Sequence, residues 1–396
     1  MPGSPQQLEP SVEVVVGDMF ESPAQTLVNT VNTVGVMGKG VALEFKHRFP
    51  DMFEDYRQRC ERGEVRLGKP YLYRRPSPPH VLNFPTKGHW RAVSRLRDIV
   101  QGLDYLEAHL DEWGITSLAV PPLGCGQGGL DWSVVGPTLY QHLSRLSIPV
   151  QLFAPHGTPH GELEPRYLQR SLASASSSDI TGVGTKPRLD AGWVALVAVL
   201  DRLERDPHHW PVGKTTFQKL AYFATAAGVP TGLIFERGSY GPFSKDVAKV
   251  MSRLVNNDLL SQEKLGRMVS HRVGTTYPAA WRAYGADLER SSDAIDRVAD
   301  LLARLRTTRS AEVAATVHFA ATTMREMEGS PPQERAVLDD VIAWKHAMKP
   351  PLVPDEVLLA MRSLAMLGWL ELRPSPDLRT DEAALVGLDD RELALF

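Results

Sequence analysis

Two glycine-rich stretches, each directly after an apolar run, constrain the fold of this chain more than any other feature. The run Thr26–Val31 leads into N-T-V-G-V-M-G-K-G, and the run Ser117–Pro121 leads into L-G-C-G-Q-G-G-L-D-W. Short apolar runs bounded by turn signals are typical of buried strands. Glycine lets a backbone approach an anion without a Cβ in the way, and unpaired N–H groups at such turns and at helix N-termini bind anions. The sequence therefore predicts two phosphate-binding loops at strand ends.

Length and composition predict a two-domain globular protein. The chain has 396 residues, of which 43% are hydrophobic and 23% charged, which allows sizeable cores. The net charge of −3 gives no reason to expect a general polyanion-binding surface. Two cysteines, Cys60 and Cys125, occur without a CxxC motif, which excludes a cysteine-rich zinc site and fits a reducing cytosol. The N-terminal residues lack a signal-peptide pattern and no apolar run reaches about 18 residues, so we expect a cytoplasmic protein without a membrane span.

Strand and helix signals alternate over the first 154 residues. The expected strands are 12–16, 26–31, 71–74, 80–84, 117–121 and 149–154, and the expected helices are 41–49, 52–62, 92–113 and 132–146. This alternation is typical of an α/β fold with helices on both faces of a sheet. Ligands of such sheets bind beyond the carboxyl ends of the strands, where both glycine loops fall.

The second half of the chain has a different character. A Ser/Gly-rich run at 171–187 predicts a flexible linker, placed at 158–188, and a mainly helical domain is expected over 189–396. The expected helices are 194–203, 216–227, 245–256, 294–305, 311–327, 334–348 and 354–367, with a strand-like exception at 234–236. Tyr222, Phe223 and Tyr240 are expected in the core. Acidic residues gather near the end of the chain, where they form a solvated tail or imitate DNA phosphates.

Two common nucleotide-binding motifs are disfavoured. The pattern Gly124-x-Gly126-x-x-Gly129 matches the dinucleotide fingerprint, which also expects an acidic residue about 20 positions later. No acidic residue occurs between Asp131 and Glu162. Gly38-Lys39-Gly40 is not a Walker A motif, because a glycine and not Ser/Thr follows the lysine.

In combination, these motifs resemble a macrodomain over residues 11–157. The motifs are G-D, L-V-N-T-V-N-T, G-V-M-G-K-G-V-A and V-P-P-L-G-C-G-Q-G-G-L-D-W. The segment N-F-P-T-K-G-H-W-R, from Asn83 to Arg91, resembles DarG-type DNA ADP-ribosyl glycohydrolase antitoxins, and the terminal ADP-ribose glycohydrolase (ALC1-like) subclass is a more distant match. The resemblance implies a three-layer α/β/α domain with a mixed six-stranded sheet, followed by the mainly helical domain.

The resemblance also implies an ADP-ribose site. It places the adenine amine at Asp18, with a backbone contact from Met19, and the distal ribose at Asn29, Asn32 and Thr86. The diphosphate would lie against Gly38, Lys39, Gly40 and Val41, and against Gly124, Cys125, Gly126, Gln127 and Gly128. Lys87 matches the catalytic lysine, with Asn29 orienting the ribose. The residues themselves leave other roles open: a helix cap for Asp18, turn formation for both asparagines, solvent exposure for Lys39 and loop filling for Cys125.

A lysine suits this chemistry in two ways, which the sequence leaves open. Its amine can attack the aldehyde form of an opened ribose as a Schiff base, or act as an acid when protonated. The glycohydrolase subclass has an aspartate where this chain has Gly128, so no carboxylate can assist from there. The histidines lack metal-ligand spacing, and no metal or cofactor is expected.

The resemblance further implies a toxin–antitoxin pair. In that family DarT attaches ADP-ribose to thymine in single-stranded DNA, DarG removes it, and the region after the macrodomain blocks the toxin. The motifs K-L-A-Y-F and Y-G-P-F-S, between residues 219 and 244, resemble antitoxin-associated Panacea or SocA-like domains. Two alternatives remain: a macrodomain that binds ADP-ribose without turnover, and a phosphatase acting on ADP-ribose 1″-phosphate.

Overall fold

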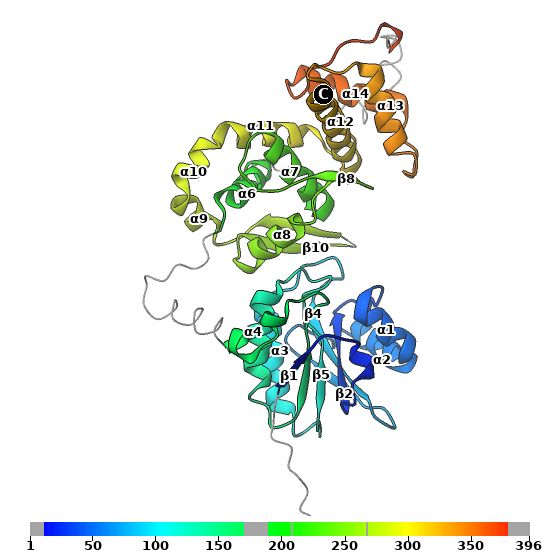
Figure 1. The fold of residues 1–396 in the computed structure, drawn as a ribbon, viewed down its shortest axis with the longest axis vertical. Helices are drawn as coiled ribbons and strands as arrows, with labels where there is room; N and C mark the ends of the chain where they lie inside the picture. Colours follow the sequence, from blue (N-terminus) through cyan, green and yellow to red (C-terminus); the bar gives the residue numbers. More distant parts are fainter. Residues whose placement is uncertain (1–11, 170–188, 207–208, 267, 379–396) are drawn as a thin grey trace, which may run out of the picture. The chain divides into compact units, whose positions relative to one another are not determined.

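The computed structural model describes residues 12–169, 189–206, 209–266 and 268–378. The chain forms two compact units, the first mainly before residue 189 and the second mainly after it (Figure 1). Most of the predicted linker, residues 170–188, lies outside the described residues. Its predicted start at residue 158 is wrong, because Leu168 is completely buried in the core of the first unit.

A six-stranded mixed sheet forms the middle of the first unit. Its strands are β1 (Val12–Val15), β2 (Thr26–Asn32), β3 (Tyr71–Tyr73), β4 (His80–Lys87), β5 (Leu118–Val120) and β6 (Val150–Phe153). Their order is β1-β6-β5-β2-β4-β3, and every neighbouring pair is parallel except β3–β4. The carboxyl ends of five strands therefore share one edge, and the predicted fold class is confirmed.

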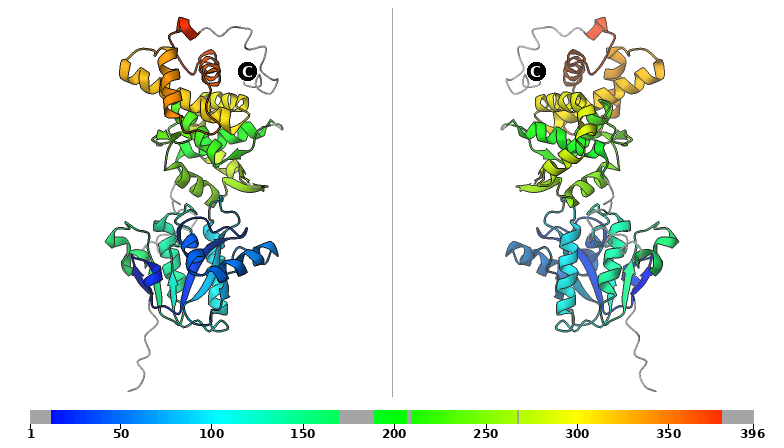
Figure 2. Two further views of the ribbon diagram at one scale, coloured as in Figure 1. Left: turned by 90° about the vertical axis from the view of Figure 1, so that its right-hand side faces the viewer. Right: turned by 90° about the vertical axis from the view of Figure 1, so that its left-hand side faces the viewer.

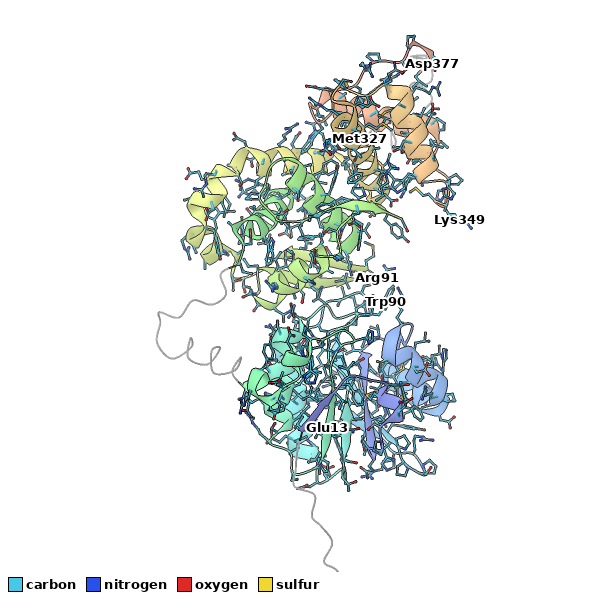
Figure 3. All side chains as sticks on the ribbon, in the orientation of Figure 1. Glu13, Trp90, Arg91, Met327, Lys349 and Asp377 are labelled. Atoms are coloured by element: carbon cyan, nitrogen blue, oxygen red, sulfur yellow. The ribbon has the colours of Figure 1, made fainter. Side chains whose placement is uncertain are left out.

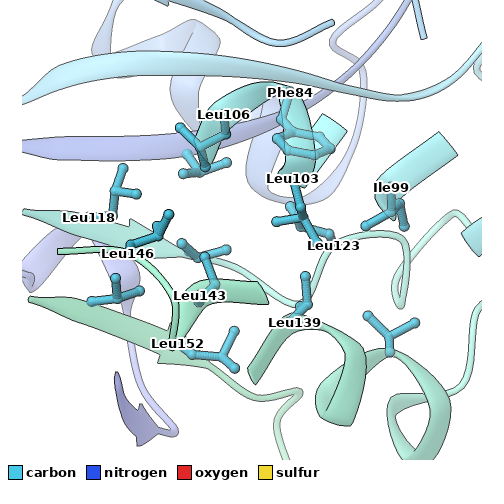
Figure 4. Packing of buried hydrophobic residues seen from close by; sticks show 14 of the residues in the cluster. Phe84, Ile99, Leu103, Leu106, Leu118, Leu123, Leu139, Leu143, Leu146 and Leu152 are labelled. Carbon is cyan, nitrogen blue, oxygen red and sulfur yellow. The ribbon is translucent and has the colours of Figure 1, made fainter. Parts of the chain in front are cut away.

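Helices cover both faces of this sheet (Figures 1 and 2). They are α1 (Gly40–Arg48), α2 (Pro50–Glu61), α3 (Leu96–His109) and α4 (Trp132–Leu143). One core layer packs α3 and α4 against the sheet (Figure 4), and a second packs α1 and α2 against the other face. The helix predicted from Ala92 begins four residues later, because the preceding residues pack on the second glycine loop, where the Ser94 N–H donates to the Gly128 carbonyl at 2.9 Å.

A close helix–strand approach fixes β4. The position of a Cβ added to Gly102 of α3 would lie 2.4 Å from the Phe84 ring of β4. Only a residue without a side chain lets α3 approach so closely. Phe84 is 1% exposed and lies three residues before Lys87, so this contact anchors the strand that ends at the predicted catalytic residue.

Helices predominate in the second unit (Figure 2). They are α6 (Ala191–Glu204), α7 (Lys214–Ala226), α8 (Val247–Asn256), α9 (Tyr277–Ala283), α10 (Gly285–Arg290), α11 (Ser292–Arg304), α12 (Thr308–Glu328), α13 (Glu334–Trp344) and α14 (Pro354–Met366). The strands β10 (Leu260–Leu265), β11 (Met268–Val273) and β7 (Val212–Gly213) form an antiparallel sheet, and β8 (Glu236–Gly238) pairs with β9 (Gly241–Phe243). No described helix has the length and apolarity needed to cross a membrane.

The hairpin β8–β9 corrects two predictions. The strand begins at Glu236, and Ile234 lies before it with 77% of its surface exposed. Tyr240 at the turn is 70% exposed and not part of the core, whereas Tyr222 and Phe223 are buried as predicted. The acidic tail beyond residue 378 lies outside the described residues.

Two buried lysines, Lys219 in α7 and Lys345 directly after α13, bond to the backbone of this hairpin. The Lys219 amine donates to the Pro242 carbonyl at 2.9 Å, and the Lys345 amine donates to the Ser239 carbonyl at 2.6 Å and pairs with Glu312. Burial lowers the pKa of Lys219 to about 8. The lysines satisfy backbone carbonyls of the hairpin, so its conformation is set by helices distant in sequence.

Two buried histidines predict acid destabilisation of the second unit. Burial lowers the pKa of His271 and of His318 to about 4, whereas an unfolded histidine has a pKa near 6.5. Between pH 4 and about 6.5 the unfolded state binds more protons than the folded state. The free energy of unfolding therefore falls as pH drops from about 6.5 to 4, by up to about 1.4 kcal/mol per pH unit for each histidine. In chemical denaturation between pH 6.5 and 4.5, His271→Gln should flatten this slope. The exposed control His346→Gln should not, and equal slopes for all three proteins would contradict the prediction.

Candidate active site

The sheet places the predicted site residues along one edge in a defined order. Asp18 follows β1, the second glycine loop follows β5, Asn32 ends β2 and Lys87 ends β4. Since the strand order is β1-β6-β5-β2-β4, the residue predicted to bind adenine stands at one end and the predicted catalytic lysine at the other. The two glycine loops lie between them.

Lys87 joins the two loops. Its backbone carbonyl accepts a hydrogen bond from the Thr33 N–H at 3.2 Å, at the start of the first loop. Its side-chain amine donates to the Gln127 carbonyl at 3.0 Å, in the second loop. The Thr33 hydroxyl adds a bond to the Gly88 carbonyl at 2.7 Å. One half-buried lysine is thus held between both predicted diphosphate-binding loops.

An irregularity in strand pairing directs Lys87 to this place. Val31 pairs with Pro85, but Asn32 pairs with Lys87, so Thr86 is an extra residue in β4. Such bulges re-aim side chains and are common beside active sites. Thr86 is 3% exposed, and its hydroxyl lies 3.4 Å from the Val31 carbonyl. The residue predicted beside the distal ribose therefore forms the bulge.

Asn32 shapes the first loop. Its side-chain oxygen accepts from the Val34 and Val36 N–H groups at 3.0 and 3.3 Å, and its amide donates to the Val36 carbonyl at 2.5 Å. The Tyr56 hydroxyl donates to the Asn32 backbone carbonyl at 2.8 Å. Burial raises the pKa of Tyr56 far above its usual value, so this phenol stays a neutral donor. The turn-forming role that the sequence left open for Asn32 is present in the structure.

The first loop ends in a helix N-terminus that has no side-chain cap. Lys39 is the residue that precedes α1, and its side chain makes no capping hydrogen bond. Gly38, Lys39 and Gly40 are exposed, and Val41 is half-buried. Uncapped amides at the positive end of a helix favour an anion. This end of the loop therefore has the features of a phosphate site.

The second loop leaves no room for a side chain at Gly128. A Cβ added there would lie 2.4 Å from the Gly124 carbonyl oxygen and 2.3 Å from the Ser94 hydroxyl. Gly124 itself has a φ of +79°, which favours glycine. Gly126 and Gln127 are exposed, and a Cβ on Gly126 would meet nothing within 4 Å. An aspartate cannot fit at position 128 of this loop, which explains the departure from the glycohydrolase subclass.

Asn29 lies inside β2 and is completely buried. Its amide donates to the Asn83 side chain at 2.9 Å, and Asn83 donates to the Tyr71 hydroxyl at 3.1 Å. Among the residues that the structure describes, none is a hydrogen-bond partner of the Asn29 side-chain oxygen, and the Met37 sulfur lies 3.9 Å from the Asn29 amide nitrogen. Met37 of the first loop thus packs against an asparagine that has an unused acceptor.

Asp18 is exposed and caps a short helix. Its carboxylate accepts from the Phe20 N–H at 2.9 Å, which matches the capping alternative, and Arg48 lies 4.0 Å from its other oxygen. Met19 is 5% exposed. One carboxylate oxygen therefore bonds the backbone, and the other lies at the limit of ion-pair distance from Arg48.

Cys125 is not a nucleophile in this structure. Burial raises the pKa of its thiol to about 12, with a smaller contribution from Asp131, so a thiolate is disfavoured. Among the described residues, one group could offer three ligand atoms to a metal: Asp104, Glu107 and His142. This group lies on α3 and α4 and includes none of the predicted site residues.

Comparisons with known proteins identify the family of this chain. A family model described as "Macro domain" matches residues 28–139. The chain is 34% identical over 310 residues to a protein named DNA ADP-ribosyl glycohydrolase from Thermus aquaticus, covering 77% of this chain and 81% of the relative. The chain belongs to the DNA ADP-ribosyl glycohydrolase family. It is therefore an enzyme, which disfavours the alternative of a binding module without turnover.

Two further similarities concern the first half of this glycohydrolase. It is 41% identical over 188 residues to a DNA ADP-ribosyl transferase–DNA ADP-ribosyl glycohydrolase fusion protein from Thermosipho africanus, covering 42% of this chain and 48% of that protein. It is 45% identical to the solved macrodomain of Thermus aquaticus DarG, covering 37% of this chain and 99% of that one, with a TM-score of 0.35.

Asn83 and Tyr56 support the site of the glycohydrolase but were not predicted as site residues. Asn83 fixes Asn29, and Tyr56 fixes the end of β2 at Asn32. Asn83 stands four residues before Lys87 in the same strand, but the extra residue Thr86 interrupts the period-two alternation between them, so spacing alone does not relate the two side chains. No sequence signal connects Tyr56 with Asn32, because α2 approaches β2 only through tertiary packing.

Replacing Gly128 by alanine should destabilise the first unit, because a Cβ would collide with backbone. Overpacking of this kind costs about 1–3 kcal/mol, measurable by thermal unfolding of the full chain. Gly126→Ala is the matched control, since its Cβ would meet open space, and it should unfold like the wild type. Equal stability of the two variants would contradict the close packing of the loop.

Proposed function

We propose that this glycohydrolase releases ADP-ribose from thymine bases of single-stranded DNA. The order of groups along the sheet edge carries the proposal. Four strand spacings separate β1 from β4, or about 19 Å at 4.8 Å each. This suits an elongated ligand with adenine near Asp18, a diphosphate at the central loops and the distal ribose near Lys87.

In this proposal the backbone holds the diphosphate. The exposed N–H groups of residues 38–41 and of Gly126 and Gln127 would donate to its oxygens, with the buried glycines Gly124 and Gly128 and the neighbouring Cys125 holding the second loop in shape. Lys39 would neutralise charge at the helix N-terminus. The free oxygen of Asp18 would accept from the adenine amine, beside the Met19 backbone.

At the other end, Lys87 would act on the C1″ atom of the distal ribose. Its amine would form a Schiff base with the opened sugar or protonate the departing base. The packing at Gly128 supports a mechanism without a second carboxylate at that position. Asn29 would contribute its unused oxygen to a ribose hydroxyl once Met37 moves aside, and Asn32 and Thr86 would line the same end.

Lys87→Ala should abolish release of ADP-ribose from an ADP-ribosylated oligonucleotide while ADP-ribose binding persists. General acid–base contributions of about 10²–10⁴-fold set the minimum expected loss of kcat. Chromatography would measure release, and calorimetry would measure the affinity for ADP-ribose. Arg74→Ala, which removes an exposed cation directly after β3 at the edge where β4 begins, is the control. A fully active Lys87→Ala variant would contradict the proposed mechanism.

We also propose that the second unit binds and blocks a DarT-like ADP-ribosyltransferase toxin. The fusion of a transferase with a glycohydrolase in Thermosipho africanus supports such a partnership. The hairpin β8–β9 offers a contact surface, since Ile234, Tyr240 and Phe243 are 77, 70 and 52% exposed. Aromatic side chains on a rigid support are typical interface anchors. Such an antitoxin would act in the cytoplasm, where removal of ADP-ribose repairs DNA.

Tyr240→Ala combined with Phe243→Ala should weaken the toxin complex, because both anchors leave the surface. Loss of two such anchors costs at least about 2 kcal/mol, or about 30-fold in Kd, measurable by calorimetry with the purified toxin. Met366→Ala, which removes an exposed methionine of α14, should leave Kd unchanged. Unaltered affinity of the double variant would exclude the hairpin as the contact.

A further inference from the structure

The residues after Lys87 depart from the charge balance of the chain. Residues 87–97 read K-G-H-W-R-A-V-S-R-L-R, with four lysines and arginines and no carboxylate, in a chain of net charge −3. The segment also contains an aromatic residue, Trp90. Basic residues interleaved with aromatic ones are the combination that binds single-stranded nucleic acids, because cations pair with phosphates and rings stack on bases.

Trp90 stands out from this segment as an exposed ring. It is 42% exposed, whereas Thr86, His89 and Ser94 are all at most 6% exposed. Its ring lies 5.4 Å from the His89 ring, and the Arg91 guanidinium lies 4.4 Å from its centroid. Figure 3 shows Trp90 and Arg91 beside each other in the loop that follows β4. A large apolar ring and a cation are thus presented together.

The loop that carries Trp90 is ordered by its own hydrogen bonds. The Arg91 N–H donates to His89 Nδ1 at 3.2 Å, and the Ala92 N–H donates to the His89 carbonyl at 2.9 Å. Ser94 then ties the segment to Gly128 of the second loop at 2.9 Å. Trp90 therefore stands on a turn anchored at both ends, which keeps the entropic cost of binding low.

Trp90 is also close to the reacting end of the site. Trp90 is the third residue after Lys87, so their Cα atoms lie within about 11 Å of each other. With ADP-ribose along the sheet edge, the attached base and its strand leave the site beyond Lys87. The nucleotides next to the modified base then pass the segment 87–97.

We propose that Trp90 and Arg91 bind the DNA strand next to the modified thymine, Trp90 by stacking on a neighbouring base and Arg91 by pairing with a phosphate. This inference rests on the proposed function and extends it, since it divides substrate recognition between two places. The glycine loops recognise ADP-ribose. The Trp90–Arg91 pair recognises the DNA strand to which the ADP-ribose is attached.

The test compares two substrates: an oligonucleotide with one ADP-ribosylated thymine, and ADP-ribosylated thymidine without flanking nucleotides. Trp90→Ala should lower kcat/KM on the oligonucleotide about tenfold, mainly through KM, because stacking of one base is lost. Activity on the nucleoside and affinity for ADP-ribose should change less than about twofold. Trp90→Phe, which keeps a ring, should retain most of the oligonucleotide activity. The thermal midpoint would identify a misfolded variant.

Arg91 gives a second measurement. Arg91→Ala should lower the slope of log affinity against log salt concentration by about 0.7 for an unmodified single strand, since one phosphate contact is lost. Arg145→Ala, which removes an exposed arginine beyond α4, should not change that slope.

Other outcomes would overturn the inference. Equal losses on both substrates would show that Trp90 only supports the fold, and unchanged oligonucleotide activity would exclude stacking. Loss of toxin affinity with intact oligonucleotide binding would assign the pair to a protein interface. If the wild type released ADP-ribose from neither substrate, the proposed function would be contradicted, independently of the proposed DNA contact. In that case, the affinities of the wild type and of Trp90→Ala for the unmodified oligonucleotide would still test whether Trp90 contacts the DNA strand.

Discussion

The parallel pairing of β2 with β4, and its shift at Thr86, is the constraint on which the site depends. It brings the Lys87 carbonyl to the first glycine loop and the Lys87 amine within 3.0 Å of the Gln127 carbonyl in the second. Without the extra residue, Asn32 would not oppose Lys87, and the amine would be aimed elsewhere. The contact of Gly102 with Phe84 fixes β4 from behind. Loops that are almost 100 residues apart in sequence thus converge on one side chain.

The sequence was sufficient for the elements whose apolar pattern decides their structure. All six strands of the sheet were expected near their observed positions, and for the five parallel strands the reason is that buried parallel strands are largely continuous apolar runs. The start of α3 was missed, since Ala92–Arg95 have helix-compatible residues that instead pack on the second loop. The strands β10 and β11 were missed because they are short, polar and half-exposed. Tyr240 was assigned to the core because no sequence signal reveals that buried lysines support an exposed hairpin.

The residues of the candidate site also divide into those that local sequence signals indicate and those whose contacts depend on tertiary packing. Its glycines and Lys87 could be proposed from the sequence because glycine runs after strands and a lysine in a distinctive motif are local signals. The bond of Tyr56 to Asn32 and the chain from Asn29 through Asn83 to Tyr71 are tertiary, and no spacing rule predicts them. Gly128 was recognised as a departure from related enzymes, but its reason needed coordinates: the neighbouring carbonyl lies where a Cβ would be.

This arrangement separates the parts of the substrate by the kind of contact that recognises them. In the proposed binding mode, backbone amides at the glycine turns bind the phosphate oxygens, whatever the neighbouring side chains are. The segment after β4 projects side chains, and these can change without disturbing the sheet. In the proposed binding mode, residues 88–91 would therefore select the leaving group while ADP-ribose stays in the same position. Because Lys87 is the last residue of β4 and the first of that segment, the proposed reacting atom would lie at the junction of the backbone-lined loops and the side chains of residues 88–91.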